Sequence, residues 1–281
     1  MHLIIIFGAI GLAYGLRNVE FFTSRNWLLR WQRCLLLFIS PPLLLITTAI
    51  AVICMGPQGK MLGLSTGWVS YLLAWFFCGW TVLVGLVLGY QGRRSVQKVN
   101  NYPQFNINGK SVFLLDNPIL FSAQIGFWHP KLVVSQGLIE RLNSEQLDAV
   151  LSHEQAHYYY RDTFWFFWLG WLEKIVPVLP NTKVLWHELL TMREIRADQW
   201  AKKQVDGLLL AETLLLMVSD RPIPPTNFYA AFSATTPPNR LTERIDALLG
   251  EADFSMQEDN YWSWSWSLLI FLPLMTVFFH Q

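Results

Sequence analysis

The sequence predicts an α-helical membrane protein of about four spans that also carries a small α+β domain on the cytoplasmic side. Three observations lead to this fold class. Residues of the AVILMFWYC set make up 53% of the 281 residues. Charged residues make up only 15%, against roughly 25% in an average soluble domain. Long apolar runs flank a more polar central region, which contains short β-branched runs and stretches of helical periodicity.

Four apolar segments are predicted to span the membrane, at Leu3–Leu16, Cys34–Met55, Gly67–Tyr90 and Tyr261–Phe279. The first is short, but no basic residues precede it and no A-x-A site follows it, so we interpret it as an uncleaved anchor. Pro41 and Pro42 interrupt the second, and a bundle tolerates such a kink. The third is uncharged and long enough for a tilted span. The fourth opens with YWSWSWS, which is typical of an interfacial aromatic belt.

The flanking cations predict the orientation. The connection after the first span holds Arg17, Arg25, Arg30 and Arg33. The next connection has only Lys60, and the third span is followed by Arg93, Arg94 and Lys98. By the positive-inside rule the N-terminus lies outside, and the region from Gln91 to Asn260 faces the cytoplasm. The last span then returns the C-terminus to the outside.

These spans predict three domains: a three-span membrane region at 1–92, a cytoplasmic domain at 93–259, and a C-terminal span at 260–281. Short β-branched runs predict two strands in the cytoplasmic domain, at Ser111–Leu115 and Lys131–Ser135. Asn143, followed three residues later by Gln146, is typical of a capping box at a helix start. Helices are predicted from there to about Tyr160 and then at Thr182–Gln204, Leu208–Val218 and Asn239–Leu249.

The segment 163–180, TFWFFWLGWLEKIVPVLP, is apolar enough for a membrane but carries Glu173 and Lys174. We interpret it as an amphipathic or re-entrant helix at the cytoplasmic interface. A full span at this place is the alternative, and it would move everything downstream to the other side.

The composition gives no support to a nucleic-acid-binding protein or to a disulfide-stabilised one. The formal net charge is +1 and no basic stripe is present, so we expect no nucleic-acid partner. The three cysteines lie in or beside apolar runs without any ligand spacing, which indicates ordinary core residues rather than a disulfide framework.

The string LSHEQAHYYYRD carries the chemistry. On a helix, His153 and His157 lie one turn apart on one face, so both imidazoles can bind a single ion. Glu154 lies one step round the helix, close enough to polarise a water at that ion. The same face continues into apolar positions, where a low dielectric strengthens the effect of a metal; these positions are Leu147, Val150 and Leu151.

A catalytic zinc needs a third protein ligand and an open fourth position. Glu194, in TMREIRADQWA, is the predicted ligand. Asp198 follows one turn later on the same face, and it is predicted to accept the free ring N–H of His153.

Four other residues are weaker candidates for the third ligand. Glu173 lies in the ambiguous apolar segment, and Glu188 has no carboxylate one turn ahead. Asp162 is expected to lie too close to the motif helix to fold back. His187 is about 10 Å from Glu194 along a helix, so the two cannot share an ion.

These motifs together resemble the gluzincin membrane peptidases. The resemblance rests on GLIERLNSEQLDAVLSHEQAHYYYRD and REIRADQWA, and runs from about Asn117 to Asp198 with a weaker echo to Leu248. Two branches share this layout: the BlaR/MecR type, which are antirepressors in beta-lactam sensing, and the CAAX-prenyl-endopeptidase and HtpX type. The short gap before Glu194 and the predicted spans are similar to the BlaR/MecR branch. That branch implies a zincin-like peptidase domain on the cytoplasmic face of a bacterial cell membrane, with the N-terminus outside.

The sequence departs from both branches. BlaR/MecR receptors carry a sensor domain after the last span, whereas this sequence ends at Gln281, so we expect no attached beta-lactam sensor. The endopeptidase branch has a His-Pro ahead of a late Arg-Ile, where this sequence has Thr236. The oxyanion-stabilising residue is therefore open. Arg240 and Arg244 are candidates, although a structural role is favoured for both.

The resemblance also implies a substrate-binding strand. In gluzincins an edge strand ahead of the motif helix pairs with the extended substrate, which grips a peptide without reading its sequence. The residues similar in place are Lys131, Leu132, Val133, Val134 and Ser135. An ordinary buried strand is the equal alternative.

The sequence thus predicts a membrane zinc metalloendopeptidase with one Zn²⁺ per chain and Glu154 as the proton acceptor. The expected partners are the bilayer and a protein or peptide substrate, namely a regulatory or membrane-associated protein at the cytoplasmic face. One alternative is a quality-control peptidase similar to the HtpX type. Another is a non-catalytic membrane signal transducer stabilised by zinc. The presence of Glu154 disfavours this alternative, because a structural zinc site needs no general base.

Overall fold

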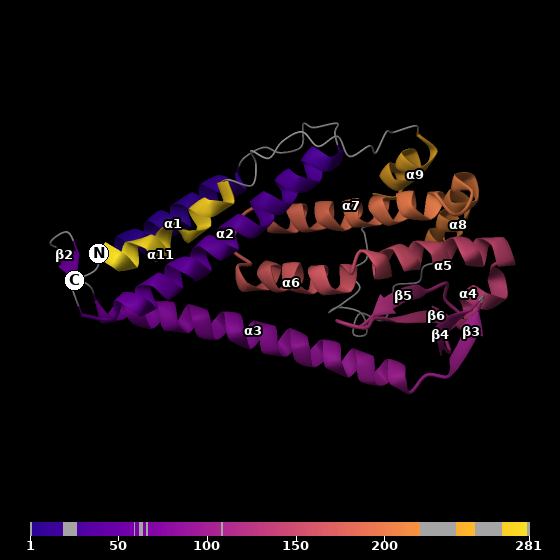
Figure 1. Cartoon of the computed structure of the whole chain (residues 1–281), viewed down its shortest axis with the longest axis horizontal. Coiled ribbons are helices and arrows are strands. Elements are labelled where there is room, and N and C mark those ends of the chain that lie inside the picture. Colours follow the sequence, from indigo (N-terminus) through magenta and orange to yellow (C-terminus); the bar gives the residue numbers. More distant parts are fainter. Residues whose placement is uncertain are drawn as a thin grey trace. The chain divides into compact units, whose positions relative to one another are not determined.

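The computed structural model describes residues 2–18, 27–58, 60–61, 64–65, 67–107, 109–219, 240–250 and 266–279 (Figure 1). The chain divides into two compact units. The first unit combines residues 1–86, 171–189 and 254–281, and the second combines 87–170 and 190–253. Three helices continue from one unit into the other, namely α3 (Trp68–Asn100), α6 (Asp162–Ile175) and α7 (Thr182–Lys202).

The first unit is helical. Its described elements are α1 (His2–Arg17), α2 (Trp27–Met55), the start of α3, the short pair β1 (Lys60–Met61) and β2 (Leu64–Ser65), and the C-terminal turns η2 (Trp266–Phe271), α11 (Leu272–Met275) and η3 (Thr276–Phe279). Helix α1 lies beside α2 in Figure 1. The C-terminal turns are tied to α2 by Thr47, whose hydroxyl donates to the carbonyl of Ile270 at 2.6 Å.

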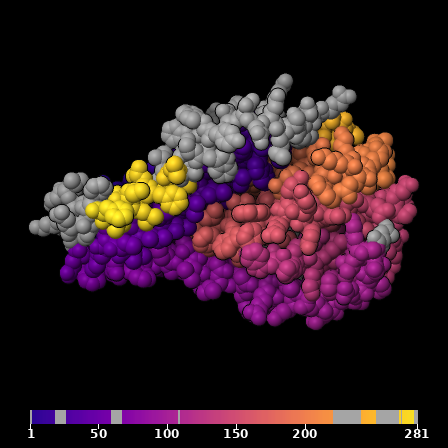
Figure 2. Space-filling model, viewed as in Figure 1, coloured from indigo at the N-terminus to yellow at the C-terminus, as the bar shows by residue number. Residues whose placement is uncertain are grey.

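Helices α2 and α3 are long and apolar enough to cross a membrane, with mean hydropathies of 2.3 and 2.1 in their most apolar windows. Pro41 and Pro42 lie inside α2 without ending it. Only 22% of the apolar window of α3 is buried, and Figure 2 shows α3 in purple along the surface. Helix α1 is shorter, and the described part of the predicted fourth span forms short helical turns. Four spans therefore remain a prediction, and the YWSWSWS string, except for its last two residues, lies outside the described residues.

The segment predicted to lie at the interface, 163–180, forms most of α6 and the turn that follows it. Its C-terminal part belongs to the first unit. There the indole Nε1 of Trp171 donates to the carbonyl of Thr81 in α3 at 2.9 Å. A few residues later, Glu188 of α7 forms a buried ion pair with Arg30 of α2.

The second unit contains a four-stranded mixed sheet in the order β3-β4-β6-β5. The strands are β3 (Gln104–Ile107), β4 (Lys110–Leu115), β5 (Ser122–Ile125) and β6 (Lys131–Ser135). Strands β4 and β6 run parallel, and the other two pairings are antiparallel. The two predicted strands are confirmed as β4 and β6. The two others were not predicted, because QFNI and SAQI are short and half polar.

Of the two alternatives for Lys131–Ser135, the edge strand is wrong and the ordinary buried strand is confirmed. Strand β6 pairs with β4 on one side and with β5 on the other. After β4 the chain forms β5 first and then returns between β4 and β5, so the later strand is enclosed by the two earlier ones. The edge strands are β3 and β5.

The helices of the second unit largely follow the predicted periodicity. They are α4 (Gln136–Arg141), α5 (Ser144–Tyr159), the start of α6, the end of α7, α8 (Gly207–Ser219) and α9 (Leu241–Leu249). The capping box is confirmed: the Asn143 side chain accepts from the Gln146 backbone N–H, and the Gln146 side chain accepts from that of Asn143. Val150 and Leu151 of α5 share a core with Leu132 and Val134 of the sheet, so the motif helix is fixed on the sheet.

Candidate metal centre

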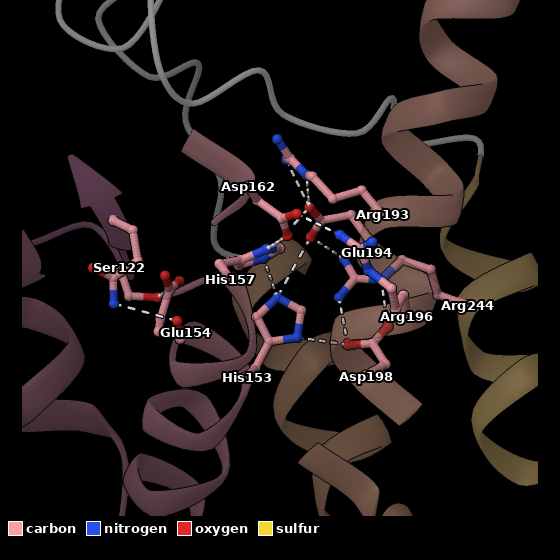
Figure 3. A network of polar contacts seen from close by, with 11 residues as sticks. Ser122, His153, Glu154, His157, Asp162, Arg193, Glu194, Arg196, Asp198 and Arg244 are labelled. Carbon is pink, nitrogen blue, oxygen red and sulfur yellow. Dashed lines mark hydrogen bonds and ion pairs between the residues drawn. The ribbon is translucent and has the colours of Figure 1, made fainter. Parts of the chain in front are cut away.

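Helices α5 and α7 bring three side chains of the second unit to one point (Figure 3). The Nε2 atoms of His153 and His157 lie 3.1 Å apart. Glu194 of α7 places Oε2 3.4 Å from Nε2 of His153 and Oε1 3.6 Å from Nε2 of His157. One ligand atom from each residue lies within 4.8 Å of the others. The structure thus brings together the three residues predicted as metal ligands.

These three residues fit a zinc ion. Zinc is bound tetrahedrally by imidazole nitrogen and carboxylate oxygen at about 2.0–2.2 Å, which puts neighbouring ligand atoms about 3.3 Å apart. The separations of 3.1 Å between the two Nε2 atoms and 3.4 Å from Nε2 of His153 to Oε2 of Glu194 are close to that value. The 3.6 Å contact of His157 is with the other oxygen of the same carboxylate. Two histidines and one glutamate also match the donor set of a catalytic site, which leaves a fourth position for water or substrate.

Asp198 lies behind His153, where its spacing from Glu194 predicted it. Its Oδ1 is 2.7 Å from Nδ1 of the ring, although the ring N–H is not aligned for a linear hydrogen bond. Arg244 of α9 holds the carboxylate from the other side, through Nε to Oδ2 at 2.7 Å and Nη2 to Oδ1 at 2.8 Å. Outer partners of this kind orient a ligand histidine and raise its basicity.

Asp162 has the corresponding place behind His157, and the sequence did not reveal it. The first residue of α6 has its Oδ2 2.7 Å from Nδ1 of the ring, and its Oδ1 pairs with Arg196. The expectation that Asp162 cannot fold back is wrong. Arg161 adopts a left-handed φ of 53°, and it separates the end of α5 at Tyr159 from the start of α6 at Asp162. The short spacing from His157 to an aspartate is the signal that could have found it.

The cluster is electrostatically prepared for a cation. Burial alone would raise the pKa of Glu194, but Arg193, His157 and Arg244 hold it well below its usual range. The pKa of Asp198 is likewise lowered, since Arg244 and His153 outweigh its burial. Both carboxylates are therefore charged at neutral pH.

His153 is affected in the opposite sense. Burial alone would lower the pKa of its imidazole, but the charges of Asp198 and Glu194 raise it to about 10. Without a metal the ring therefore carries a proton at neutral pH. A metal that binds at Nε2 has to displace that proton, and it then takes over the favourable interaction with both carboxylates.

Glu154 faces the sheet. Its Oε1 accepts a hydrogen bond from the hydroxyl of Ser122 at 2.7 Å, and its backbone carbonyl accepts one from Nε2 of Gln124 at 3.2 Å. Figure 3 shows Glu154 turned toward Ser122, while both histidines turn toward Glu194. Ser122 and Gln124 belong to β5, which the sequence did not predict, so neither contact could be anticipated.

The strand predicted to bind substrate has structural roles. Ser135 caps α4, and the ammonium group of Lys131 contacts Asn100 and lies 4.7 Å from the centre of the Phe113 ring. The free edge beside Glu154 belongs to β5, since no other strand of the described part of the chain pairs with its outer side.

Two of the other candidates have partners of their own. Glu188 pairs with Arg30 in the first unit, and Arg240 pairs with Glu243 at 2.8 Å. Arg244 reaches the metal centre, with Nη1 3.5 Å from Oε2 of Glu194. Its fork on Asp198 supports the structural role favoured from the sequence. Thr236 lies outside the described residues.

The group of His153, His157 and Glu194, with Glu154 between the two histidines in sequence, is consistent with the HExxH-type site of a metallopeptidase. Residues 121–168 match the sequence profile of Peptidase family M48. The matched stretch includes β5, β6 and the whole of α5 and ends before Glu194. This match supports a metallopeptidase of the M48 family. No curated protein matches the chain significantly.

Proposed function

We propose that the protein is a membrane-embedded zinc metalloendopeptidase that cleaves regulatory or membrane-associated proteins at the cytoplasmic face. The observation that carries the proposal is the convergence of His153, His157 and Glu194 on one point, with Glu154 next to His153 on the same helix. The M48 match over this part of the chain supports the reaction class.

The contacts of the residues support the following roles. A zinc ion held by the three ligands would supply Lewis-acid chemistry toward water and a peptide carbonyl. Glu154 accepts the proton of the attacking water and delivers it to the leaving amine. Ser122 donates to Oε1 of Glu154, which orients the carboxylate. The aspartates behind the two histidines hold the imidazole rings in place.

Strand β5 takes over the substrate role first expected of Lys131–Ser135. Its outer edge offers backbone groups to an extended peptide, and Ser122 on the same strand touches the base. Pairing through the backbone gives affinity without a strict sequence requirement. This suits an enzyme that cleaves exposed, extended segments.

The membrane location rests on α2 and α3 and on the arginines that flank them. With the N-terminus outside, the cations after the first and third predicted spans lie in the cytoplasm. The similarity to the BlaR/MecR branch supports a bacterial cell membrane and a regulatory substrate. Turnover of damaged membrane proteins, as in the HtpX type, is the second role within the same chemistry.

The test compares the full-length wild type with Glu154→Gln in detergent, with zinc content and cleavage of an unfolded protein measured on the same samples. We expect about one zinc per chain in both. Because an amide cannot accept a proton, the variant should lose about 10²–10⁴-fold in turnover. A chelator should abolish wild-type cleavage, and added zinc should restore it. Equal cleavage by both proteins refutes the mechanism. Zinc binding without any cleavage favours the transducer.

A further inference from the structure

An aromatic cluster joins the β5–β6 hairpin to α6 in the second unit. Phe127, at the hairpin turn, lies with its ring centre 4.9 Å from that of Phe164 and 5.0 Å from that of Phe167. Trp128 also packs on Phe164, at 4.9 Å. We call the cluster the aromatic patch and define it as Phe127, Trp128, Phe164, Trp165, Phe167 and Trp168.

The three tryptophans of the aromatic patch are exposed, by 66% for Trp128, 59% for Trp165 and 44% for Trp168. The other face of α6 buries Phe166, Leu169 and Leu172. Single exposed apolar residues are ordinary, whereas a group of large aromatic residues on one surface marks a binding surface. Tryptophan in particular is enriched where a protein meets the headgroup layer of a membrane.

The next turn of α6 indicates that the partner of the aromatic patch is the membrane. In the first unit, Trp171 donates to the carbonyl of Thr81, and its indole lies 3.4 Å from where a Cβ of Gly85 would be. Both positions are inside the uncharged run of α3, which ends at the exposed Tyr90 and is followed by Arg93 and Arg94. Gly85 precedes Tyr90 by about 7.5 Å along the helix. If α3 spans the membrane, Trp171 therefore lies in its apolar layer, close to the cytoplasmic border.

The other end of α6 contributes to a polar cluster of the second unit. Helix α6 begins at Asp162, which contacts His157 at the metal centre. Helix α6 thus has a polar cluster at its start and, in the first unit, a contact with the apolar run of α3 near its end. Trp165 and Trp168 lie between these ends, about 9 and 4.5 Å before Trp171. Exposed tryptophans this close to an apolar layer are stabilised by the headgroup region of a membrane.

We propose that the aromatic patch is a lipid-binding surface that rests in the cytoplasmic headgroup layer and holds the free edge of β5 against the membrane. Gly126 connects the end of β5 to Phe127 at a φ of +142°, and a Cβ there would lie 2.9 Å from Cα of Pro130. The turn is therefore tight, and Trp128 follows the edge strand closely. The substrates are accordingly extended peptide segments next to the bilayer. This inference rests on the proposed function, and specifically on its membrane location.

The first experiment measures lipid contact in the full-length protein reconstituted into phosphatidylcholine–phosphatidylglycerol vesicles. The exposed Cys54 and the half-buried Cys78 are replaced by serine, and the buried Cys34 is kept. A nitroxide is attached at Trp128→Cys or Trp165→Cys, and its collisions with oxygen and with a water-soluble nickel complex are compared. We expect a several-fold higher oxygen-to-nickel ratio than at the matched control Phe105→Cys, an exposed aromatic residue on the opposite edge strand.

A label at Phe76→Cys, in the exposed face of α3, separates the two claims. If position 76 is in lipid and position 128 is as open to nickel as position 105, the patch proposal is overturned and the membrane location stands. If the label at position 76 also collides freely with the nickel complex, the membrane location is refuted, and the patch proposal is refuted with it. A label at position 128 that is shielded from both reagents indicates a protein contact and overturns the lipid assignment.

The second experiment tests the substrate class with one peptide sequence, offered free or carrying a palmitoyl anchor in the same vesicles. The wild type should cleave the anchored peptide several-fold faster. The double variant Trp128→Ser, Trp165→Ser should lose this preference while still cleaving the free peptide, and Phe105→Ser should keep it. Equal cleavage of both peptides by the wild type overturns the proposal. So does a parallel loss on both peptides in the double variant, which would assign the patch a structural role.

Discussion

The Oδ2 atom of Asp162 lies 2.7 Å from Nδ1 of His157. This contact gives the second histidine of the cluster a carboxylate behind its ring, as Asp198 does for His153. The two aspartates come from different helices, and each is held by an arginine, Arg196 or Arg244. Both imidazoles are therefore oriented before any ion binds, which reduces the cost of assembling the site.

Asp162→Asn should weaken zinc binding about 10–100-fold, because the amide cannot support the ring of His157 as a carboxylate does. The measurement is competition with a chelator of known affinity. Asp148→Asn, an exposed aspartate on α5, is the matched control and should bind zinc as the wild type does. Equal affinity in Asp162→Asn and the control would mean that the contact with His157 does not matter for the metal.

Ser122→Ala should lower kcat with little change in zinc content, because it removes the hydroxyl that donates to Glu154. Hydrogen bonds to charged groups contribute about 1.5–3 kcal/mol, which corresponds to a loss of about 10–100-fold in rate. Ser122→Thr keeps a hydroxyl and should restore part of the activity. Ser111→Ala, an exposed serine of β4, serves as the control. A variant that loses zinc together with activity would show that Ser122 supports the fold instead.

Zinc binding to the metal-free protein should release a proton at pH 7.5. The pKa of His153 is raised to about 10 in the folded, metal-free state, so the ring is protonated there and has to give up its proton to the ion. Apparent zinc affinity should rise about tenfold per pH unit for one displaced proton. Calorimetry in buffers of different ionisation enthalpy counts the protons, and a count of zero would contradict the raised pKa.

The same shifts set the stability of the metal-free protein. The raised pKa of His153 stabilises the folded protein at pH values below the unfolded-state pKa of histidine, which is about 6.5. This contribution to the free energy of unfolding is lost as the pH rises through about 10. The lowered pKa values of Glu194 and Asp198 stabilise above the unfolded carboxylate values, and their contribution is lost in acid. Thermal unfolding should therefore show greatest metal-free stability at about pH 5–6.5. Added zinc should move that optimum upward.

Reporter fusions test the orientation. Fusions after Lys98 and after Asp253 should both report the cytoplasm, and a fusion at Gln281 should report the outside, because arginines flank the first and third predicted spans. Opposite signals at Lys98 and Asp253 would mean that the chain crosses the membrane between them. The segment 163–180 would then span the membrane, and the proposed position of the aromatic patch in the headgroup layer would be refuted.

Local pattern determined much of this protein. The spacing of His153 and His157 places them on one face of a helix whatever the helix packs against, and the same holds for Glu194 and Asp198. The Asn143 capping box and strand β6 were predicted for the same reason, since the signals lie within a few residues. Apolar runs likewise identified α2 and α3, because length and composition are properties of the segment itself.

Only the tertiary structure decided which groups surround the ligands. Strand order depends on contacts distant in sequence, so Lys131–Ser135 became an inner strand and β5 took the edge beside Glu154. The place of Asp162 depends on one left-handed residue, Arg161, which no periodicity predicts. Arg244 reaches Asp198 from a helix far along the chain. A repeat along the chain specifies which side chains share a face, whereas packing between elements decides what each face meets.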